Sequence, residues 1–150
     1  MDVSAEETEI DISAFKYEEN ADGTINITDC NEKEETLVIP SEIEGKRVRA
    51  VKLNFNNDRL ESECQIKRLV ISRRNTKYLV SIGDYAFDNC SNLKNITLPN
   101  SLTSIGKGAF VQCRFLSKII IPGNLKVIQR STFFNCISLQ EVEIKEGLNI

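Results

Sequence analysis

From residue 82 onward the sequence repeats every 23 residues, and this period restricts the possible folds more than any other feature. Isoleucine, phenylalanine, cysteine and leucine recur at matching positions in three successive units. The four columns are Ile82, Ile105 and Ile128; Phe87, Phe110 and Phe133; Cys90, Cys113 and Cys136; and Leu93, Leu116 and Leu139. A unit this short has too little apolar surface to fold alone, so such units are stable only when they stack. The period therefore predicts a solenoid.

Each unit combines a strand pattern with a helix-like pattern. The L-x-x-I-x-L motif alternates around its centre, which predicts strands at residues 95–98, 118–121 and 141–144, side by side in one parallel sheet. Pro99 and Pro122 follow the first two of these strands, and proline ends ladder pairing because it lacks an N–H. In the A-F-x-x-C-x-x-L motif, apolar residues lie three or four positions apart, which predicts a helical turn.

Towards the N-terminus the pattern loosens, but it can be followed for about two more coils, which gives about five in total. Leu37 and Ile39 fit one earlier strand, and Leu69 and Ile71 fit the next. Ile82 follows Ile71 by 11 positions where later copies have 7, so residues 73–78 are expected to hold an insertion.

A hairpin is expected before the first coil. Asp22-Gly23 separates two short alternating segments, a strong hairpin signal. We expect the hairpin to cover the first coil, because an uncovered strand edge invites pairing. The predicted division is a flexible acidic N-terminus at residues 1–12, a capping hairpin at 13–30 and a solenoid at 31–150.

Composition excludes several classes of function. The chain has no histidine, which excludes Ser–His and Cys–His nucleophiles and histidine metal sites. With no phosphate-binding glycine loop and no paired carboxylate motif, we expect no enzyme activity, metal or cofactor. Nineteen Lys and Arg are interleaved with 22 Asp and Glu, so nucleic-acid binding is not expected. No apolar run is long enough for a membrane span, and no secretory signal is visible.

The repeated cysteines and phenylalanines have more than one interpretation. Cys90, Cys113 and Cys136 could be nucleophiles, metal ligands or disulfide partners, but their spacing matches no zinc motif. Stacked equivalent side chains point in parallel, which suits a relaxed disulfide poorly, so a buried ladder of free thiols is favoured. Cys30 and Cys64 lie outside this register, and one of them could be exposed. The phenylalanine column could be a binding stripe, but a stacked core spine is favoured.

The unit I-G-x-x-A-F-x-x-C-x-x-L-x-x-I-x-L-P closely resembles the treponemal, or BspA-like, class of leucine-rich repeats. Segments from Ile82 to Pro99 and from Ile105 to Pro122 match in full, whereas Gln129 replaces glycine and Lys145 replaces proline in the last copy. Together with the period, the resemblance implies an α/β, β-rich, right-handed leucine-rich-repeat solenoid with 23-residue units and an N-terminal capping hairpin. It also implies an extracellular or cell-surface protein, often an adhesin for host or bacterial partners. Because the chain shows no signal sequence, a cytoplasmic location stays open.

Outward-facing strand positions form the candidate binding surface, because repeat proteins commonly bind partners on a concave sheet. These positions are Asn95, Thr97, Lys118, Ile120, Glu141 and Glu143. We expect a protein-binding module, with a structural spacer in a longer surface protein as the alternative. No polar segment covers the last coil around Val142 and Ile144, so the chain is expected to be part of a longer repeat protein or to stack end to end.

Overall fold

A computed structural model describes residues 10–30, 35–53, 64–72 and 77–146. The first residues of the predicted flexible N-terminus, and residues 73–76 of the predicted insertion, lie outside this part. In the described residues the only helix is a 3₁₀ turn, η1 (Ile12–Ala14), and all other regular elements are strands.

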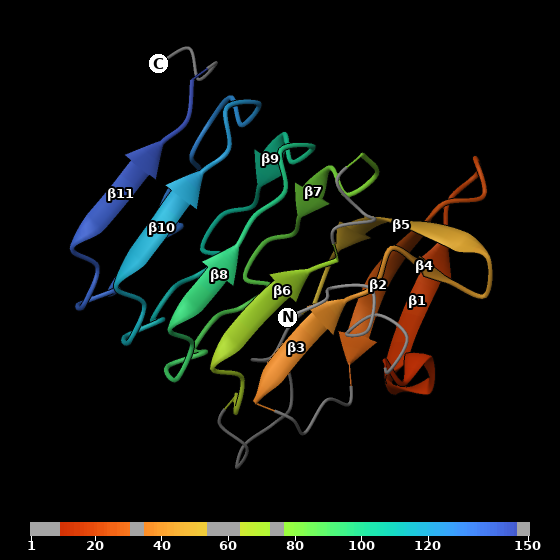
Figure 1. The fold of residues 1–150 in the computed structure, drawn as a ribbon, viewed down its shortest axis with the longest axis horizontal. Coiled ribbons are helices and arrows are strands. Elements are labelled where there is room, and N and C mark those ends of the chain that lie inside the picture. Colours follow the sequence, from red (N-terminus) through yellow and green to blue (C-terminus); the bar gives the residue numbers. More distant parts are fainter. Residues whose placement is uncertain (1–9, 31–34, 54–63, 73–76, 147–150) are drawn as a thin grey trace.

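Five parallel strands form one long side of the molecule, and we call them the strand row (Figure 1). They are β3 (Thr36–Ile39), β6 (Arg68–Ile71), β8 (Asn95–Thr97), β10 (Lys118–Ile121) and β11 (Glu141–Ile144). Register follows the repeat, since Lys118 pairs with Glu141 and Ile121 with Ile144. Inward positions such as Leu37, Leu69 and Ile119 are at most 1% exposed.

The predicted single sheet is wrong at one junction. Hydrogen-bonded pairing joins β3, β6 and β8, and separately β10 and β11. In the described chain, β8 and β10 are not paired in a ladder, although the two strands lie side by side (Figure 1). Ile96 and Leu98 are only half-buried, whereas the equivalent Ile119 and Ile121 are buried. The units on the two sides of this junction match position for position, so their pattern carries no signal of the break.

A second sheet forms the return side. It contains β1 (Phe15–Glu19), β2 (Ile25–Cys30), β5 (Lys46–Val51), β7 (Ser81–Ile82) and β9 (Ser104–Ile105), with the short β4 (Glu42–Ile43) paired to β5. The predicted hairpin is present: β1 and β2 pair antiparallel, and Gly23 (φ 82°) takes the left-handed conformation in the connecting turn. All further pairing along the chain, from β2 to β5, β7 and β9, is parallel.

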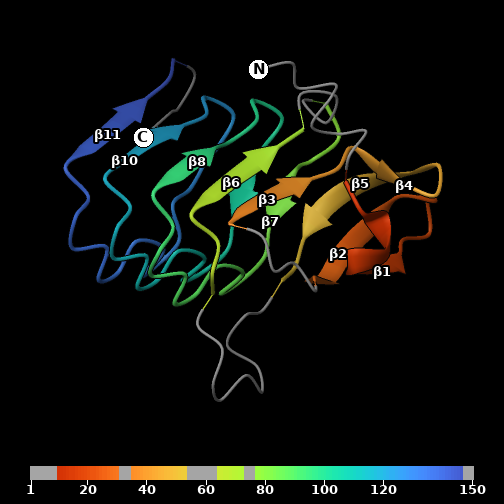
Figure 2. The same ribbon diagram turned by 60° about the horizontal axis from the view of Figure 1, so that its bottom comes forward.

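The predicted helical turn is wrong, because successive β-turns occupy that segment of each unit. Two residues per turn segment have a positive φ, for example Tyr85 (54°) and Asn89 (58°), and this conformation interrupts a helix. The backbone N–H groups donate to the next coil instead, as Phe87 does to the Ala109 carbonyl (2.8 Å). These turn segments form stacked loops along the edge of the molecule from which the strands of the row begin (Figure 2).

The phenylalanine column is a core spine, as predicted. Phe87 and Phe110 have no exposed surface, and their rings stack with centroids 5.5 Å apart. Phe110 and Phe133 stack at 5.8 Å, and Phe133 is half-buried because its coil is the last one described. Such ring pairs add to the stabilisation from buried area alone.

The five cysteines are unbridged. Cys90 and Cys113 are fully buried and Cys136 is half-buried. Each later thiol donates to the phenylalanine carbonyl of the preceding coil: Cys113 Sγ lies 3.4 Å from the Phe87 oxygen, and Cys136 Sγ lies 3.1 Å from that of Phe110. Burial raises the pKa of all three thiols above the usual range, so they stay protonated. Cys30 and Cys64 are buried as well.

Candidate binding surface

The outward positions of β8, β10 and β11 lie on one face of the strand row. Asn95, Thr97, Lys118, Glu141 and Glu143 are exposed. Ile120 is half-buried between the columns. Strand pairing places Lys118 beside Glu141 and Ile120 beside Glu143. The structure thus brings the six candidate residues together, with β8 next to the β10–β11 pair but not bonded to it.

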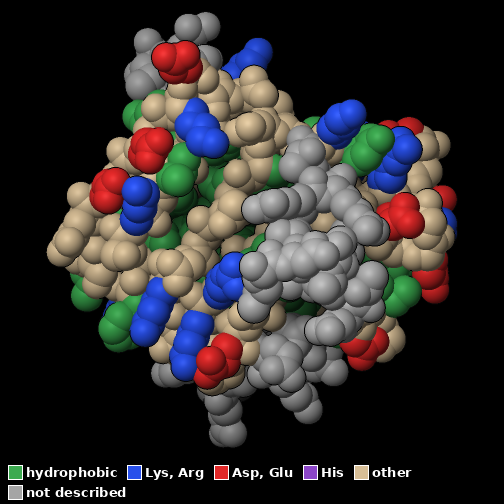
Figure 3. All heavy atoms as spheres, viewed as in Figure 1, with side chains coloured by type: hydrophobic (Ala, Val, Ile, Leu, Met, Phe, Trp, Pro, Cys, Tyr) green, Lys and Arg blue, Asp and Glu red, His purple; other side chains and the backbone are tan. Residues whose placement is uncertain are grey.

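The lysine on this face is paired with both of its carboxylates. Lys118 Nζ lies 2.8 Å from Glu141 Oε1 and 3.8 Å from Glu143 Oε2. The hydrogen bond to Glu141 raises the pKa of Lys118, with the nearby carboxylates adding to the effect. Basic and acidic side chains accordingly lie next to one another over β10 and β11 in the space-filling view (Figure 3). Surface ion pairs of this kind give orientation to a contact and little stability.

Sequence reasoning missed the extension of this face onto β3 and β6. Pairing aligns Val38 with Val70, and Val70 with Thr97. Ile120 occupies the same position of the unit on β10, so the outward face carries an aliphatic column interrupted only by Thr97. The sequence does contain a signal for this extension, because each valine lies between two inward-facing residues of an alternating strand. Val70 is 7% exposed, so little of its side chain is available to a partner.

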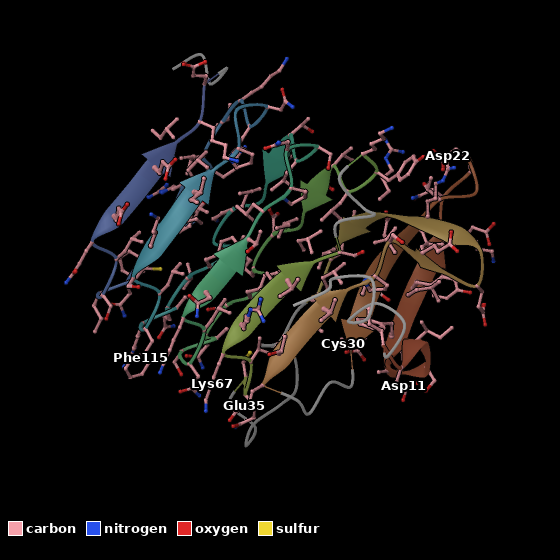
Figure 4. The ribbon with its side chains drawn as sticks, in the orientation of Figure 1. Asp11, Asp22, Cys30, Glu35, Lys67 and Phe115 are labelled. Atoms are coloured by element: carbon pink, nitrogen blue, oxygen red, sulfur yellow. The ribbon has the colours of Figure 1, made fainter. Side chains whose placement is uncertain are left out.

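Charged and aromatic side chains border the strand row at the edge where its strands begin. Figure 4 shows Glu35, Lys67 and Phe115 along this edge. Lys67 Nζ lies 2.6 Å from Glu35 Oε1, and the ring of Phe115, which is 55% exposed, lies 6.0 Å from Lys94 Nζ. A polar border of this kind is typical of the rim of a protein interface.

The described residues hold no group of three or more metal-ligating side chains. They also include no helix long and apolar enough to cross a membrane. A hollow of about 570 Å³ opens where β10 and β11 end, and it is lined by Asn100, Gly123, Asn124 and residues 143–146.

The sequence from residue 55 to 150 matches a family model described as the BspA type leucine-rich repeat region, with six copies. This match covers well over half of the chain. The chain belongs to the BspA-type leucine-rich repeat family. The resemblance found in the 23-residue unit is thereby confirmed.

Solved structures of bacterial leucine-rich repeat proteins share this fold. A leucine-rich repeat protein from Bacteroides capillosus ATCC 29799 has a TM-score of 0.71 at 22% identity, over 91% of this chain and 97% of that one. The T. pallidum leucine-rich repeat protein has a TM-score of 0.64 at 25% identity, over 89% of this chain and 70% of that one. No curated protein matches the chain.

A leucine-rich cell surface protein from Faecalibacterium prausnitzii A2-165 has a TM-score of 0.61 at 22% identity. The similarity covers 90% of this chain but only 42% of that protein, so this chain spans less than half its length.

Proposed function

We propose that this BspA-type repeat chain is a non-enzymatic module that binds another protein through the outward face of the strand row. One observation carries the proposal: the register of β10 and β11 aligns Lys118, Ile120, Glu141 and Glu143 on a face that also includes Asn95 and Thr97. An aliphatic residue surrounded by exposed polar side chains can anchor a partner, while the ion pairs around it fix orientation.

In this proposal the module is a right-handed solenoid of 23-residue units, divided as residues 1–12, 13–30 and 31–150. The β1–β2 hairpin serves as its N-terminal cap, which the pairing of β2 with β5 supports. The cap would protect the solenoid from edge-to-edge association.

The proposed setting is the cell surface, with adhesion or host interaction as the role. Similarity to a leucine-rich cell surface protein supports this setting through the shared fold. The balanced charge favours a protein partner over a nucleic acid. A spacer that holds another domain away from a surface is the alternative, and it requires no bound partner.

Two matched substitutions test the binding face. Thr97→Arg introduces a long charged side chain on the proposed face, and Thr103→Arg introduces the same group at an exposed position just before β9, outside that face. The full chain, immobilised, is exposed to extracts of surface proteins from host and bacterial cells. Circular dichroism first verifies that both variants keep the parent fold.

We expect a partner captured by the parent chain to be retained by Thr103→Arg and lost by Thr97→Arg. Equal capture by both variants would move the binding site away from the strand row. Capture of no partner from any extract would favour the spacer.

A further inference from the structure

Cys64 lies out of register with the cysteine column of the later coils. Ladder pairing aligns Leu69 with Ile96, so these two coils are offset by 27 residues, whereas the cysteines of the column follow one another at 23. With the offset of 27, the position of Cys64 corresponds to Ser91, one residue beyond Cys90. The side chains of Cys64 and Cys90 are therefore not stacked equivalents and need not point in parallel.

The thiols of Cys64 and Cys90 are in contact. The Cys90 thiol is hydrogen-bonded to the Cys64 sulfur, and Asn92 Nδ2 donates to the Cys64 carbonyl at 3.5 Å, which fixes the two coils against each other beside the thiols. The next two thiols make a different contact, because Cys113 and Cys136 donate to phenylalanine carbonyls of the preceding coil. At the junction of Cys64 with Cys90, sulfur meets sulfur instead.

This arrangement removes the geometric objection to a disulfide within the column. Neighbouring coils are about 4.8 Å apart, within the Cα separation that a disulfide spans, but a relaxed bridge needs the two Cβ atoms at about 3.8 Å. Parallel stacked equivalents stay too far apart, whereas Cys64 is displaced by one position from such an arrangement. Both residues belong to one apolar cluster, with Cys64 8% and Cys90 0% exposed, so a bridge would replace a contact that is already packed.

We propose that Cys64 and Cys90 are a redox pair, which a small disulfide such as oxidised glutathione converts into a disulfide bond between two successive coils. Cys113 and Cys136 stay reduced under the same conditions, because their sulfurs are directed at carbonyl groups. The pair is distinct from the outward face of the strand row and does not depend on the function proposed for that face.

The reaction is thiol–disulfide exchange in two steps. Cys64, the more exposed of the two, loses its proton to solvent, and its thiolate attacks one sulfur of oxidised glutathione. This attack forms a mixed disulfide and releases one glutathione thiolate, which takes up a proton. The Cys90 thiolate then attacks the Cys64 sulfur, breaks the mixed disulfide and releases the second glutathione. Two protein thiols are oxidised to one disulfide, and one glutathione disulfide is reduced to two thiols.

The test oxidises the folded full chain in a glutathione redox buffer at about pH 8.5, near the ordinary pKa of a thiol. Burial raises the pKa of Cys90, so exchange is slow, and incubation continues until the bridged fraction is constant. The protein is then unfolded, its remaining thiols are alkylated, and the peptides are mapped by mass spectrometry. Cys64→Ala removes one partner, and Cys113→Ala is the matched control that removes a neighbouring thiol and leaves the pair intact.

We expect the parent chain and Cys113→Ala to lose two hydrogens each and to yield a peptide that joins Cys64 to Cys90, whereas Cys64→Ala loses none. The bridge should raise the thermal midpoint by about 5 °C or more, and a reductant should reverse the rise. A chain that keeps all five thiols would overturn the proposal. So would a bridge between Cys90 and Cys113, or a lasting glutathione adduct on Cys64, which would show that Cys90 does not reach it.

Discussion

The ring stack predicts that two phenylalanines at equivalent positions of the repeat contribute unequally to the free energy of unfolding. Phe110 has no exposed surface and stacks on two rings, at 5.5 and 5.8 Å, whereas Phe133 is half-buried and stacks on one. Phe→Ala in a closed core costs about 3–5 kcal/mol, and two ring pairs place Phe110→Ala towards the upper end. For Phe133→Ala we expect about 1.5–2.5 kcal/mol, since roughly half the buried area and one ring pair are lost.

Urea unfolding followed by circular dichroism measures both costs, and unchanged m values would show that the comparison is sound. Phe115→Ala is the control, since its ring is 55% exposed and should contribute less than about 1 kcal/mol. If Phe110→Ala does not fold, Phe110→Leu and Phe133→Leu repeat the comparison with a smaller loss of volume. Equal costs, or a larger cost at Phe133, would refute the placement of the coils.

Three further predictions concern the thiols and a turn. In the native protein Cys136 should react with a thiol reagent before Cys90 and Cys113, because it is only half-buried; equal rates for the three would contradict the ladder. The free energy of unfolding should be constant up to about pH 8.5 and fall as the pH rises further, because thiols ionise in the unfolded chain while burial keeps the pKa of Cys113 raised in the folded one. Thermal melts across this pH range should show a smaller decrease for Cys113→Ala. An equal decrease in both proteins would count against this cause. Gly108→Ala should be destabilising for two reasons: Gly108 has a positive φ of 60°, and the new Cβ would meet the Tyr85 ring. Tyr85→Ala should relieve the contact part of the loss and leave the backbone part; a thermal shift with no rescue at all would exclude the contact as a cause.

Strands and core columns were predictable because burial imposes its period directly on the sequence. Leu69 and Ile71, or Ile119 and Ile121, alternate with outward residues, and each pair is buried in a strand at the expected place. The hairpin could be read from Asp22-Gly23, since a two-strand turn needs a residue that accepts a positive φ.

The turn segments could not be read in the same way. Apolar spacings of three and four fit a helix and a chain of β-turns equally well, because both place such residues on one side. The difference lies in backbone conformation: Tyr85 (φ 54°) and Gln112 (φ 59°) take the left-handed form without being glycine, and the N–H of each donates to the next coil. This strain is offset by hydrogen bonds to the neighbouring coil, and a single unit of sequence does not reveal that neighbour.

The candidate surface was predictable by position but not by extent. Alternation placed Lys118 and Ile120 on the outward side, and the structure agrees. The contribution of Val38 and Val70 depends on register across the irregular early coils, where insertions hide the period.

Because β8 and β10 are not paired in a ladder, we expect their junction to be the most easily opened one in the described strand row. At this junction the strand row contributes no ladder pairing, so the two coils are joined through the β7–β9 pairing and through the hydrogen bonds between their turn segments. Tension along the stacking axis should therefore open this junction from the strand-row side while the opposite side still holds. In a pulling experiment on the full chain, we expect the first rupture to separate β10 and β11 as one body from β3, β6 and β8. In a module exposed to shear, opening at the β8–β10 junction would let the proposed binding face change its curvature before any coil unfolds.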